Sequence, residues 1–133
     1  MDEGLLDELL TRAVADAAPE EVMPEVSGAP GWTLARREAF LAFHRARRDG
    51  LTGPEREQGF AVIAEGRPVG VGRIRALDAP GTYEIGIWIG RSARGRGIAG
   101  AAVRALGREV RDAGGTRAIS RRRDGVVEVP LTG

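Results

Sequence analysis

The 133-residue chain contains no cysteine, no lysine and no asparagine, and its only histidine is His44. Without cysteine there is no disulfide, no thiolate nucleophile and no cysteine-ligated zinc. Without lysine, a P-loop lysine and Schiff-base chemistry are both excluded. A single histidine also argues against a histidine-rich metal site and against a Ser-His-Asp triad. We therefore expect a protein that uses no metal.

Long apolar runs are missing as well. No segment approaches the roughly 20 apolar residues that span a bilayer, and the acidic residues 2–3 at the start are unlike a secretory signal. We therefore expect a cytoplasmic protein with no membrane partner. Hydrophobic residues make up 42% of the chain and charged residues 29%, which is the balance of a globular domain.

Charge is distributed unevenly, although the net charge is only +1. Residues 1–59 carry 12 acidic residues and 7 arginines, a net charge of −5, whereas residues 91–123 carry 10 arginines and 2 acidic residues, a net charge of +8. A basic segment that follows an acidic one predicts an anionic ligand or partner for the second half of the chain.

Hydrophobic spacing predicts two helices in the first part of the chain. Apolar residues recur at helical spacing over residues 5–17. Prolines and glycines over residues 19–31 then predict a loop without helix. Thr33 is placed to cap a second helix that runs to Asp49, with Gly50 as its stop. His44 is expected to be a half-buried residue of this helix.

Strands are predicted from residue 60 onward. Residues 60–64 and 69–76 form a predicted hairpin around a turn at residues 65–67. A third strand over residues 82–89 alternates its side chains between two faces, with Glu84, Gly86 and Trp88 on one of them. The remaining pattern predicts a helix over 98–113, a strand over 116–120, a basic turn over 121–125 and a last strand over 126–129.

The segment between the third strand and the following helix is rich in glycine and arginine. Glycines allow the backbone to turn tightly and its N–H groups to approach a ligand, and the start of the following helix attracts phosphate. With Arg94 and Arg96 beside them, the glycines at 95, 97 and 100 predict a pyrophosphate site.

The pattern Arg94-x-x-Gly97-x-Ala99 after a strand resembles the signature of the GNAT superfamily of acyl-CoA-dependent N-acetyltransferases. The order of two helices, a hairpin and a third antiparallel strand is also similar to that family, and Trp32-Thr33 resembles its actinobacterial members. The resemblance, which covers about residues 20–120, implies an α/β fold with a mixed, mostly antiparallel sheet flanked by helices. It implies one N-acetyltransferase-like domain over residues 1–133, with a helical acceptor-side part (1–58), an acetyl-CoA-binding core (59–120) and an atypical tail (121–133).

The resemblance also implies roles for individual residues. The cosubstrate would be acetyl-CoA, whose pantetheine arm would pair with the backbone of Ile87, Trp88 and Ile89. Its pyrophosphate would be held by residues Arg94, Gly95, Arg96, Gly97, Ile98, Ala99 and Gly100. Gly86 would leave room near the thioester. A small-molecule or peptide amine would attack the thioester directly, with Glu84 as its base; the alternative is that Glu84 is a solvent-facing residue of an alternating strand.

The chain departs from the family at its C-terminal end. Few residues remain after Thr116, where the family usually has a strand, a helix and a closing strand pair. The family's asparagine and its tyrosine general acid have no counterparts, because the only tyrosine, Tyr83, lies upstream of the motif. We therefore expect an incomplete C-terminal end whose open sheet edge could pair in a homodimer. A catalytically inactive CoA-binding or oligomerisation remnant is the alternative function.

Two other function classes fit parts of the sequence less well. Gly95-x-Gly97-x-x-Gly100 also matches a dinucleotide (NADP-type) fingerprint. A dinucleotide-binding function would, however, require a parallel strand directly before the first glycine and an acidic residue about 20 positions after it. The arginines of 91–123 could contact a nucleic acid, yet that segment has no aromatic residue to stack on bases. We expect no nucleic-acid partner and read Arg104, Arg108 and Arg111 as a solvated helix face.

Four further positions allow a structural and a functional interpretation. Trp32 and Trp88 are expected to pack first and to line an acceptor pocket only second. Glu55 and Glu57 are expected in a solvated loop, and the alternative is that their carboxylates favour a cationic amine as the acceptor.

Overall fold

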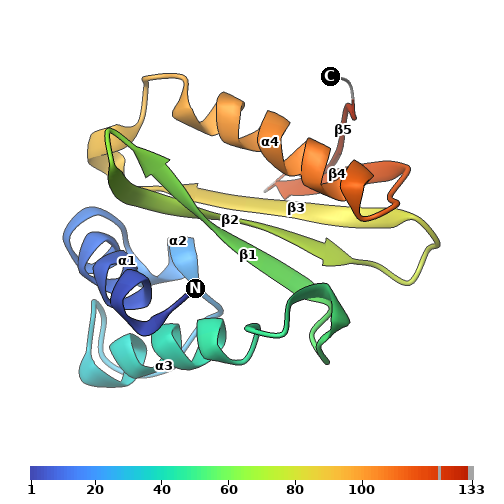
Figure 1. Cartoon of the computed structure of the whole chain (residues 1–133). Helices are drawn as coiled ribbons and strands as arrows, with labels where there is room; N and C mark the ends of the chain where they lie inside the picture. Colours follow the sequence, from blue (N-terminus) through green and yellow to red (C-terminus); the bar gives the residue numbers. More distant parts are fainter. Residues whose placement is uncertain (123, 132–133) are drawn as a thin grey trace.

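The computed structural model describes residues 1–122 and 124–131 (Figure 1). Its helices and short 3-10 segments are α1 (Glu3–Asp16), α2 (Pro19–Val22), α3 (Leu34–Arg45), η1 (Gly50–Thr52), η2 (Arg91–Ala93) and α4 (Ile98–Asp112). Its strands are β1 (Glu57–Ala64), β2 (Arg67–Ala76), β3 (Thr82–Ile89), β4 (Arg117–Arg122) and β5 (Gly125–Val129).

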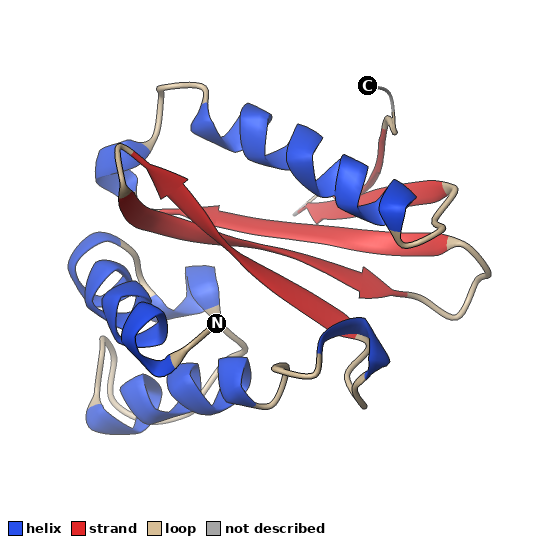
Figure 2. Ribbon diagram, in the orientation of Figure 1, coloured by secondary structure: helices blue, strands red, loops and turns tan. Residues whose placement is uncertain are grey.

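The five strands form one open sheet in the order β1-β2-β3-β4-β5. All neighbouring strands are antiparallel except β3 and β4, which are parallel and are joined through α4. Helices α1, α2 and α3 lie on one face of the sheet and α4 on the other (Figures 1 and 2). The expected mixed, mostly antiparallel sheet flanked by helices is therefore confirmed. A doubly wound dinucleotide fold is excluded, because the strand before the glycine segment pairs antiparallel with β2.

Side chains along β2 and β3 point alternately to the two faces of the sheet, so part of the hydrophobic core lies on each face. Val71 lies opposite Trp88, and both pack against α1 and α3, where Leu6, Leu9 and Phe40 are fully buried. Ile74 lies opposite Ile85 and packs against α4 through Leu106 and Val110. Burial of each such side chain contributes about 1.5–3 kcal/mol, so both helical layers are firmly held to the sheet.

The helices follow the sequence pattern with two differences. Thr33 caps α3 as predicted, its hydroxyl accepting from the Arg36 N–H at 3.2 Å. However, α3 ends at Arg45 rather than Asp49, and a 3-10 turn begins at Gly50, where a stop was expected. The predicted absence of helix after Pro19 was wrong, because Pro19 opens the one-turn helix α2, at a position where proline is tolerated.

The strands lie close to their predicted places. The hairpin turn between β1 and β2 uses positive φ at Glu65 and Gly66, and β3 has the predicted bounds. The basic turn over 121–125 was wrong in part, because Arg121 and Arg122 belong to β4. Arg123, also part of that prediction, lies outside the described residues.

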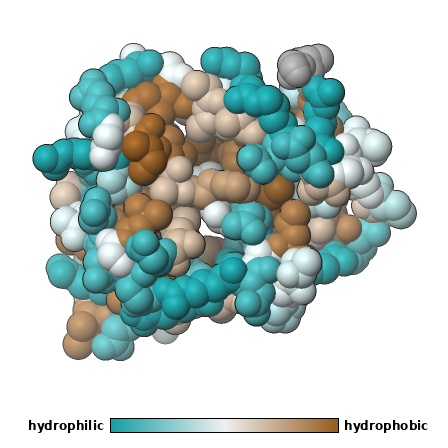
Figure 3. Space-filling view, in the orientation of Figure 1, coloured by the Kyte–Doolittle hydropathy of each residue, from teal (hydrophilic) through white to brown (hydrophobic). Residues whose placement is uncertain are grey.

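An apolar groove of about 440 Å³ runs between β1 and α4. Figure 3 shows the apolar side chains gathered around a hollow in this face. Ile63 at the sheet edge is 54% exposed here, while Ala101 and Ala105 form the small-residue side of α4. The opposite face of the sheet, beneath α2 and α3, holds the charged side chains described next.

Candidate functional site

Strands β3 and β4 separate soon after they begin to pair. Their register joins only Thr82, Tyr83 and Glu84 of β3 with residues 117–119 of β4. Among the described residues, no strand pairs with the rest of β3 on this side, although β2 pairs with it on the other. Ile87, Trp88 and Ile89 therefore lie on a free strand edge, which is where an extended ligand could add main-chain hydrogen bonds.

The glycine segment continues from this edge to the start of α4. Gly95 and Gly97 have φ values of +79° and +76°, which are strained for residues with a Cβ. A Cβ at either position would meet no atom within 4 Å, so the space beside them is open. Gly97 gives α4 no side-chain cap among the described residues. The first N–H groups of α4, at Ile98, Ala99 and Gly100, therefore suit an anion.

The arginines of this segment brace the loop. Arg94 donates from Nε to the Ile89 carbonyl at 2.9 Å and from Nη2 to Glu21 at 3.0 Å. Arg96 donates to the Ser92 carbonyl at 2.9 Å. The structure thus gives both side chains a positioning role, and their contribution to ligand binding stays a prediction.

Two acidic residues of the N-terminal helices hold the loop from the other side, and no local pattern in the sequence predicts either contact. Asp16 accepts from the backbone N–H of Ser92 at 3.0 Å and from its hydroxyl at 2.6 Å. Burial opposes ionisation of Asp16, but the bonds from Ser92 and the charge of Arg12 hold its pKa below the usual range. Glu21 pairs with Arg91 at 2.8 Å, and this bond is the largest cause of its lowered pKa.

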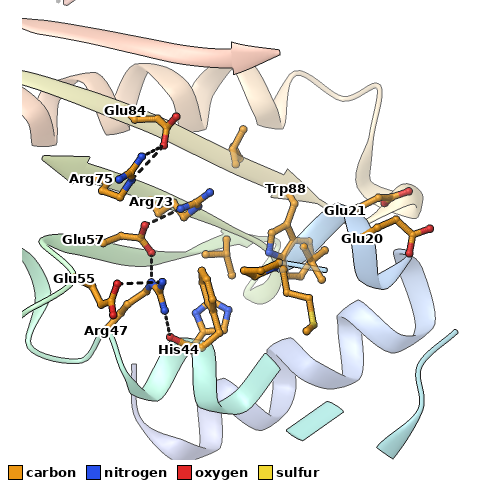
Figure 4. Close-up of a pocket in the computed structure, with 16 residues that line it drawn as sticks. Glu20, Glu21, His44, Arg47, Glu55, Glu57, Arg73, Arg75, Glu84 and Trp88 are labelled. Atoms are coloured by element: carbon orange, nitrogen blue, oxygen red, sulfur yellow. Dashed lines mark hydrogen bonds and ion pairs between the residues drawn. The ribbon is translucent and has the colours of Figure 1, made fainter. Parts of the chain in front are cut away.

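A cavity of about 510 Å³ lies on the sheet face that α2 and α3 cover (Figure 4). Its floor comes from β1, β2 and β3, and its walls from α2 and the end of α3. Five carboxylates, three guanidiniums and the single imidazole line it. Because Trp88 and Ile87 of the free strand edge also line the cavity, it opens beside the region predicted to hold the thioester.

Glu84, the predicted base, lines this cavity. Its carboxylate accepts from Arg75 Nη2 at 3.0 Å and Nε at 3.3 Å, and it pairs with Arg121 Nε at 2.5 Å. Burial raises the pKa of Glu84, but the bonds and charges of the two arginines outweigh burial and the pKa lies below its usual value. Glu84 is therefore ionised at neutral pH and is not the solvent-facing residue of the alternative reading, since its side chain is only 11% exposed.

Glu57 forms a second carboxylate centre, and its predicted position was wrong. It was expected in a loop but begins β1, where its side chain is 2% exposed. It accepts from Arg73 Nη1 at 2.6 Å and lies 2.7 Å from Arg47 Nε. Arg47 stacks on Phe43, 3.6 Å from the ring centre, and pairs with Glu55 at 3.5 Å. A buried carboxylate is tolerated here because two cations neutralise it.

His44 is buried in the wall of the same cavity, as expected of a helix residue. Burial, and then the charges of Arg47 and Arg73, lower its pKa to about 4. The imidazole is consequently neutral at physiological pH. Trp88 is also buried and contacts Phe40 edge-on at 6.4 Å, while Trp32 donates from its indole N–H to the Ala17 carbonyl at 2.9 Å.

Two other sequence expectations can be compared with the described residues. Tyr83 packs against Gly115 on the α4 side, so it does not reach the cavity. Arg104, Arg108 and Arg111 lie on the exposed face of α4, as predicted.

Nowhere within residues 1–122 and 124–131 do three or more metal-ligating side chains gather in a group fit to hold an ion. In the same part of the chain, every helix is too short or too polar to traverse a bilayer.

Comparison with known proteins gives a consistent family assignment. The model of the acetyltransferase (GNAT) domain family matches residues 6–123. No curated protein matches in sequence.

Solved structures resemble the chain in fold. An aminoglycoside 6'-N-acetyltransferase complexed with coenzyme A superimposes with a TM-score of 0.61 at 18% identity, covering 90% of this chain and 56% of that one. A GNAT-family acetyltransferase from Bacillus anthracis gives 0.61 at 19%, with 90% and 65% covered. The GNAT domain of S. lividans PAT gives 0.64 at 14%, with 96% and 85% covered. The chain thus spans little more than half the length of the first of these proteins.

Proposed function

Because the family match extends over residues 6–123, the chain belongs to the GNAT acetyltransferase family, and we propose that it transfers an acetyl group from acetyl-CoA to an amine. The observation that carries this proposal is the continuity of the free β3 edge with the uncapped start of α4. The first suits an extended pantetheine arm and the second a pyrophosphate. Structures with coenzyme A or acetyl-CoA bound are known for similar proteins.

Different residues bind different parts of the cosubstrate. The backbone of Ile87, Trp88 and Ile89 pairs with the pantetheine arm. Residues 94–100 hold the pyrophosphate through their N–H groups, and Gly97 leaves the space for it. The whole of this site is main chain, which explains why arginine side chains in the loop can be engaged with Glu21, Ile89 and Ser92.

The chemistry is a direct transfer. The neutral amine nitrogen forms a bond to the acetyl carbonyl carbon, the carbon–sulfur bond breaks, and the sulfur leaves as thiolate. The nitrogen releases one further proton to solvent, which gives the neutral amide. The ammonium proton of the acceptor must be lost before attack, and Glu84 accepts it through water. The lowered pKa of Glu84 makes it a weak base that is always ionised at neutral pH. The thiolate takes its proton from solvent, because Tyr83 packs on the α4 face.

The acceptor binds in the 510 Å³ cavity beside the β3 edge. Its volume suits a small molecule or the end of a peptide.

Calorimetric titration with acetyl-CoA, with NADP as the control ligand, tests cosubstrate binding. Micromolar binding of acetyl-CoA without an NADP signal supports the proposal. Release of free thiol in the presence of amines then tests turnover. Binding without thiol release from a broad amine set leaves the alternative, a CoA-binding protein that has lost activity.

A homodimer through the C-terminal sheet edge remains part of the proposal. The edge strand β5 exposes Val126 by 54% and Val127 by 39%, and a second copy paired there would cover both. Sedimentation analysis tests this expectation, since a monomer at all concentrations contradicts it.

A further inference from the structure

A row of charged side chains crosses the sheet on the floor of the cavity. It begins with Glu57 on β1, continues through Arg73 and Arg75 on β2, and ends with Glu84 on β3 and Arg121 on β4. The strand register explains the row, because Arg75 lies directly opposite both Glu57 and Glu84. Figure 4 shows the side chains of Glu57, Arg73, Arg75 and Glu84 following one another along the floor.

Within this row the arginine side chains are more exposed than the glutamate side chains. The side chains of Glu57 and Glu84 are 2% and 11% exposed, whereas those of Arg73 and Arg75 are 38% and 41% exposed. A ligand in the cavity therefore meets guanidinium groups, and the carboxylates lie beneath them.

The row also carries more positive than negative charge. Glu57 is paired with Arg47 and Arg73, and Glu84 with Arg75 and Arg121, so each carboxylate has two guanidinium partners. A guanidinium has five N–H donors. The described bonds of Arg73 to Glu57 and of Arg75 to Glu84 use one and two of them. Donors consequently remain for an anion.

The acidic residues at the rim do not cancel this excess. Glu21 is paired with Arg91 and Arg94, which lie outside the row. Glu55 shares Arg47 with Glu57, so the three carboxylates of Glu55, Glu57 and Glu84 face four guanidiniums, those of Arg47, Arg73, Arg75 and Arg121. Glu20 is exposed at the rim and can attract an ammonium group, but it lies on α2 and not in the row.

Arg73 is held at the reacting end of the cavity. A Cβ at Gly86 would lie 2.8 Å from Arg73 Nε and 3.2 Å from its Cζ, so the guanidinium rests across β3 at Gly86. The next residues, Ile87 to Ile89, form the free edge assigned to the pantetheine arm. An anion bound by Arg73 therefore lies close to the amine that attacks the thioester.

We propose that the acceptor is a small amine that also carries a carboxylate, and that Arg73 and Arg75 bind this carboxylate. This inference rests on the acetyl-transfer function proposed above. It makes both arginines specificity-determining residues, since hydrogen bonds from a guanidinium to a carboxylate are charge-assisted and directional.

Matched acceptor pairs test the inference. Each pair consists of an ω-amino acid and its carboxamide of the same length, beginning with the shortest chains, so that the amines are alike and only the charge of the second group differs. We expect kcat/KM to favour the amino acid by about tenfold or more in at least one pair, the size of a hydrogen bond to a charged group. Equal rates for acid and amide in every pair, or faster reaction of the amides, overturns the inference.

Substitutions of the two arginines on the cavity floor test whether they cause the preference for the amino acid over its carboxamide. Arg73→Met and Arg75→Met should each reduce the acid-to-amide ratio to near unity, mainly through KM. The double variant Arg73→Met/Glu57→Gln should reduce the ratio in the same way. Because Glu57→Gln removes the negative charge, no buried carboxylate is left with a single guanidinium partner in this variant. Arg117→Met is the matched control, because Arg117 is a half-exposed, ion-paired arginine that does not line the cavity. A ratio that survives both single substitutions overturns the inference.

A binding measurement separates this inference from the proposed function. The ω-amino acids should raise the melting temperature of the wild-type protein in a saturable way, and the carboxamides should not. Arg73→Met should remove the shift. If acetyl-CoA binds but no amine is acetylated, the transfer function fails, and the thermal shift alone decides whether the carboxylate site exists.

Discussion

Arg73 lies across Gly86, with a distance of only 2.8 Å between its Nε and the position a Cβ would occupy at Gly86. The same guanidinium donates from Nη1 to Glu57 at 2.6 Å. The missing side chain on β3 thus allows an arginine of β2 to reach a buried carboxylate of β1. Three neighbouring strands are connected through one side chain on the cavity floor.

Substitution of Gly86 by alanine should disturb this connection. The new methyl group would lie 2.8 Å from Nε and 3.2 Å from Cγ and Cζ of Arg73, so the guanidinium must move and its bond to Glu57 weakens. We expect a loss of about 1–3 kcal/mol in the free energy of unfolding, measured by urea denaturation, together with a loss of activity.

Gly59→Ala provides the matched control for that substitution. Gly59 lies opposite Arg73 on β1, but a Cβ there would contact only Met1, at 3.4 Å. We expect its effect on stability to lie within about 0.5 kcal/mol of zero. Equal losses in the two variants would show that the overlap with Arg73 is not the cause.

Gly97→Ala should weaken acetyl-CoA binding. Gly97 has φ +76°, and a Cβ there projects into the open space assigned to the pyrophosphate. The substitution costs about 1 kcal/mol of stability because of the left-handed backbone. Calorimetry should show acetyl-CoA affinity reduced at least about tenfold, the equivalent of 1.4 kcal/mol.

Gly114 serves as the control at the other end of α4. It has φ +87°, and a Cβ there also meets no atom within 4 Å. Gly114→Ala should therefore cost similar stability and leave acetyl-CoA affinity unchanged. A similar fall in affinity for both variants would assign the effect to the helix as a whole.

Periodicity predicted most of the fold because the elements that position the site are locally encoded. The alternation of Glu84, Gly86 and Trp88 placed these residues on one face, and the Gly97 turn marked the start of α4. The braces of the site are not local. Glu21 meets Arg91 and Asp16 meets Ser92 across 70 or more residues, and no spacing rule relates such positions.

Glu57 shows why a loop prediction failed at the site itself. Flanking glycine, proline and charged residues are typical of loops, and only tertiary pairing with Arg47 and Arg73 makes its burial at the start of β1 tolerable. A charged residue at a strand end thus cannot be placed from its own neighbours.

Glu84→Gln should lower kcat by about 100-fold or more, the range of a positioned acid–base group, while acetyl-CoA affinity changes little. Glutamine keeps the shape but cannot accept the ammonium proton through water. Steady-state kinetics and calorimetry on the same preparation separate the two effects. Glu128→Gln is the control, because Glu128 is a half-exposed, arginine-paired carboxylate of β5 away from the cavity. Unchanged kcat in Glu84→Gln at every pH removes Glu84 as the base.

Stability should fall with pH below 6.5 because of His44. Its pKa is lowered from 6.5 to about 4 in the folded protein, so the unfolded chain binds a proton in this interval and the folded chain does not. The stability that His44 contributes is present above pH 6.5 and is lost as pH falls through 4. From pH 7 to pH 5 the expected loss is about 2 kcal/mol. Below 4.5, the lowered pKa values of Glu3 and Glu84 add losses of the same sign.

His44→Gln isolates this contribution. Glutamine does not titrate, so the variant should lack the loss between pH 7 and pH 5 whatever its absolute stability. Urea denaturation of both proteins at the two pH values measures the difference directly. Parallel losses in wild type and variant would mean that another group takes up the proton. A loss confined to the wild type means that the neutral imidazole in the cavity wall depends on its burial beside Arg47 and Arg73.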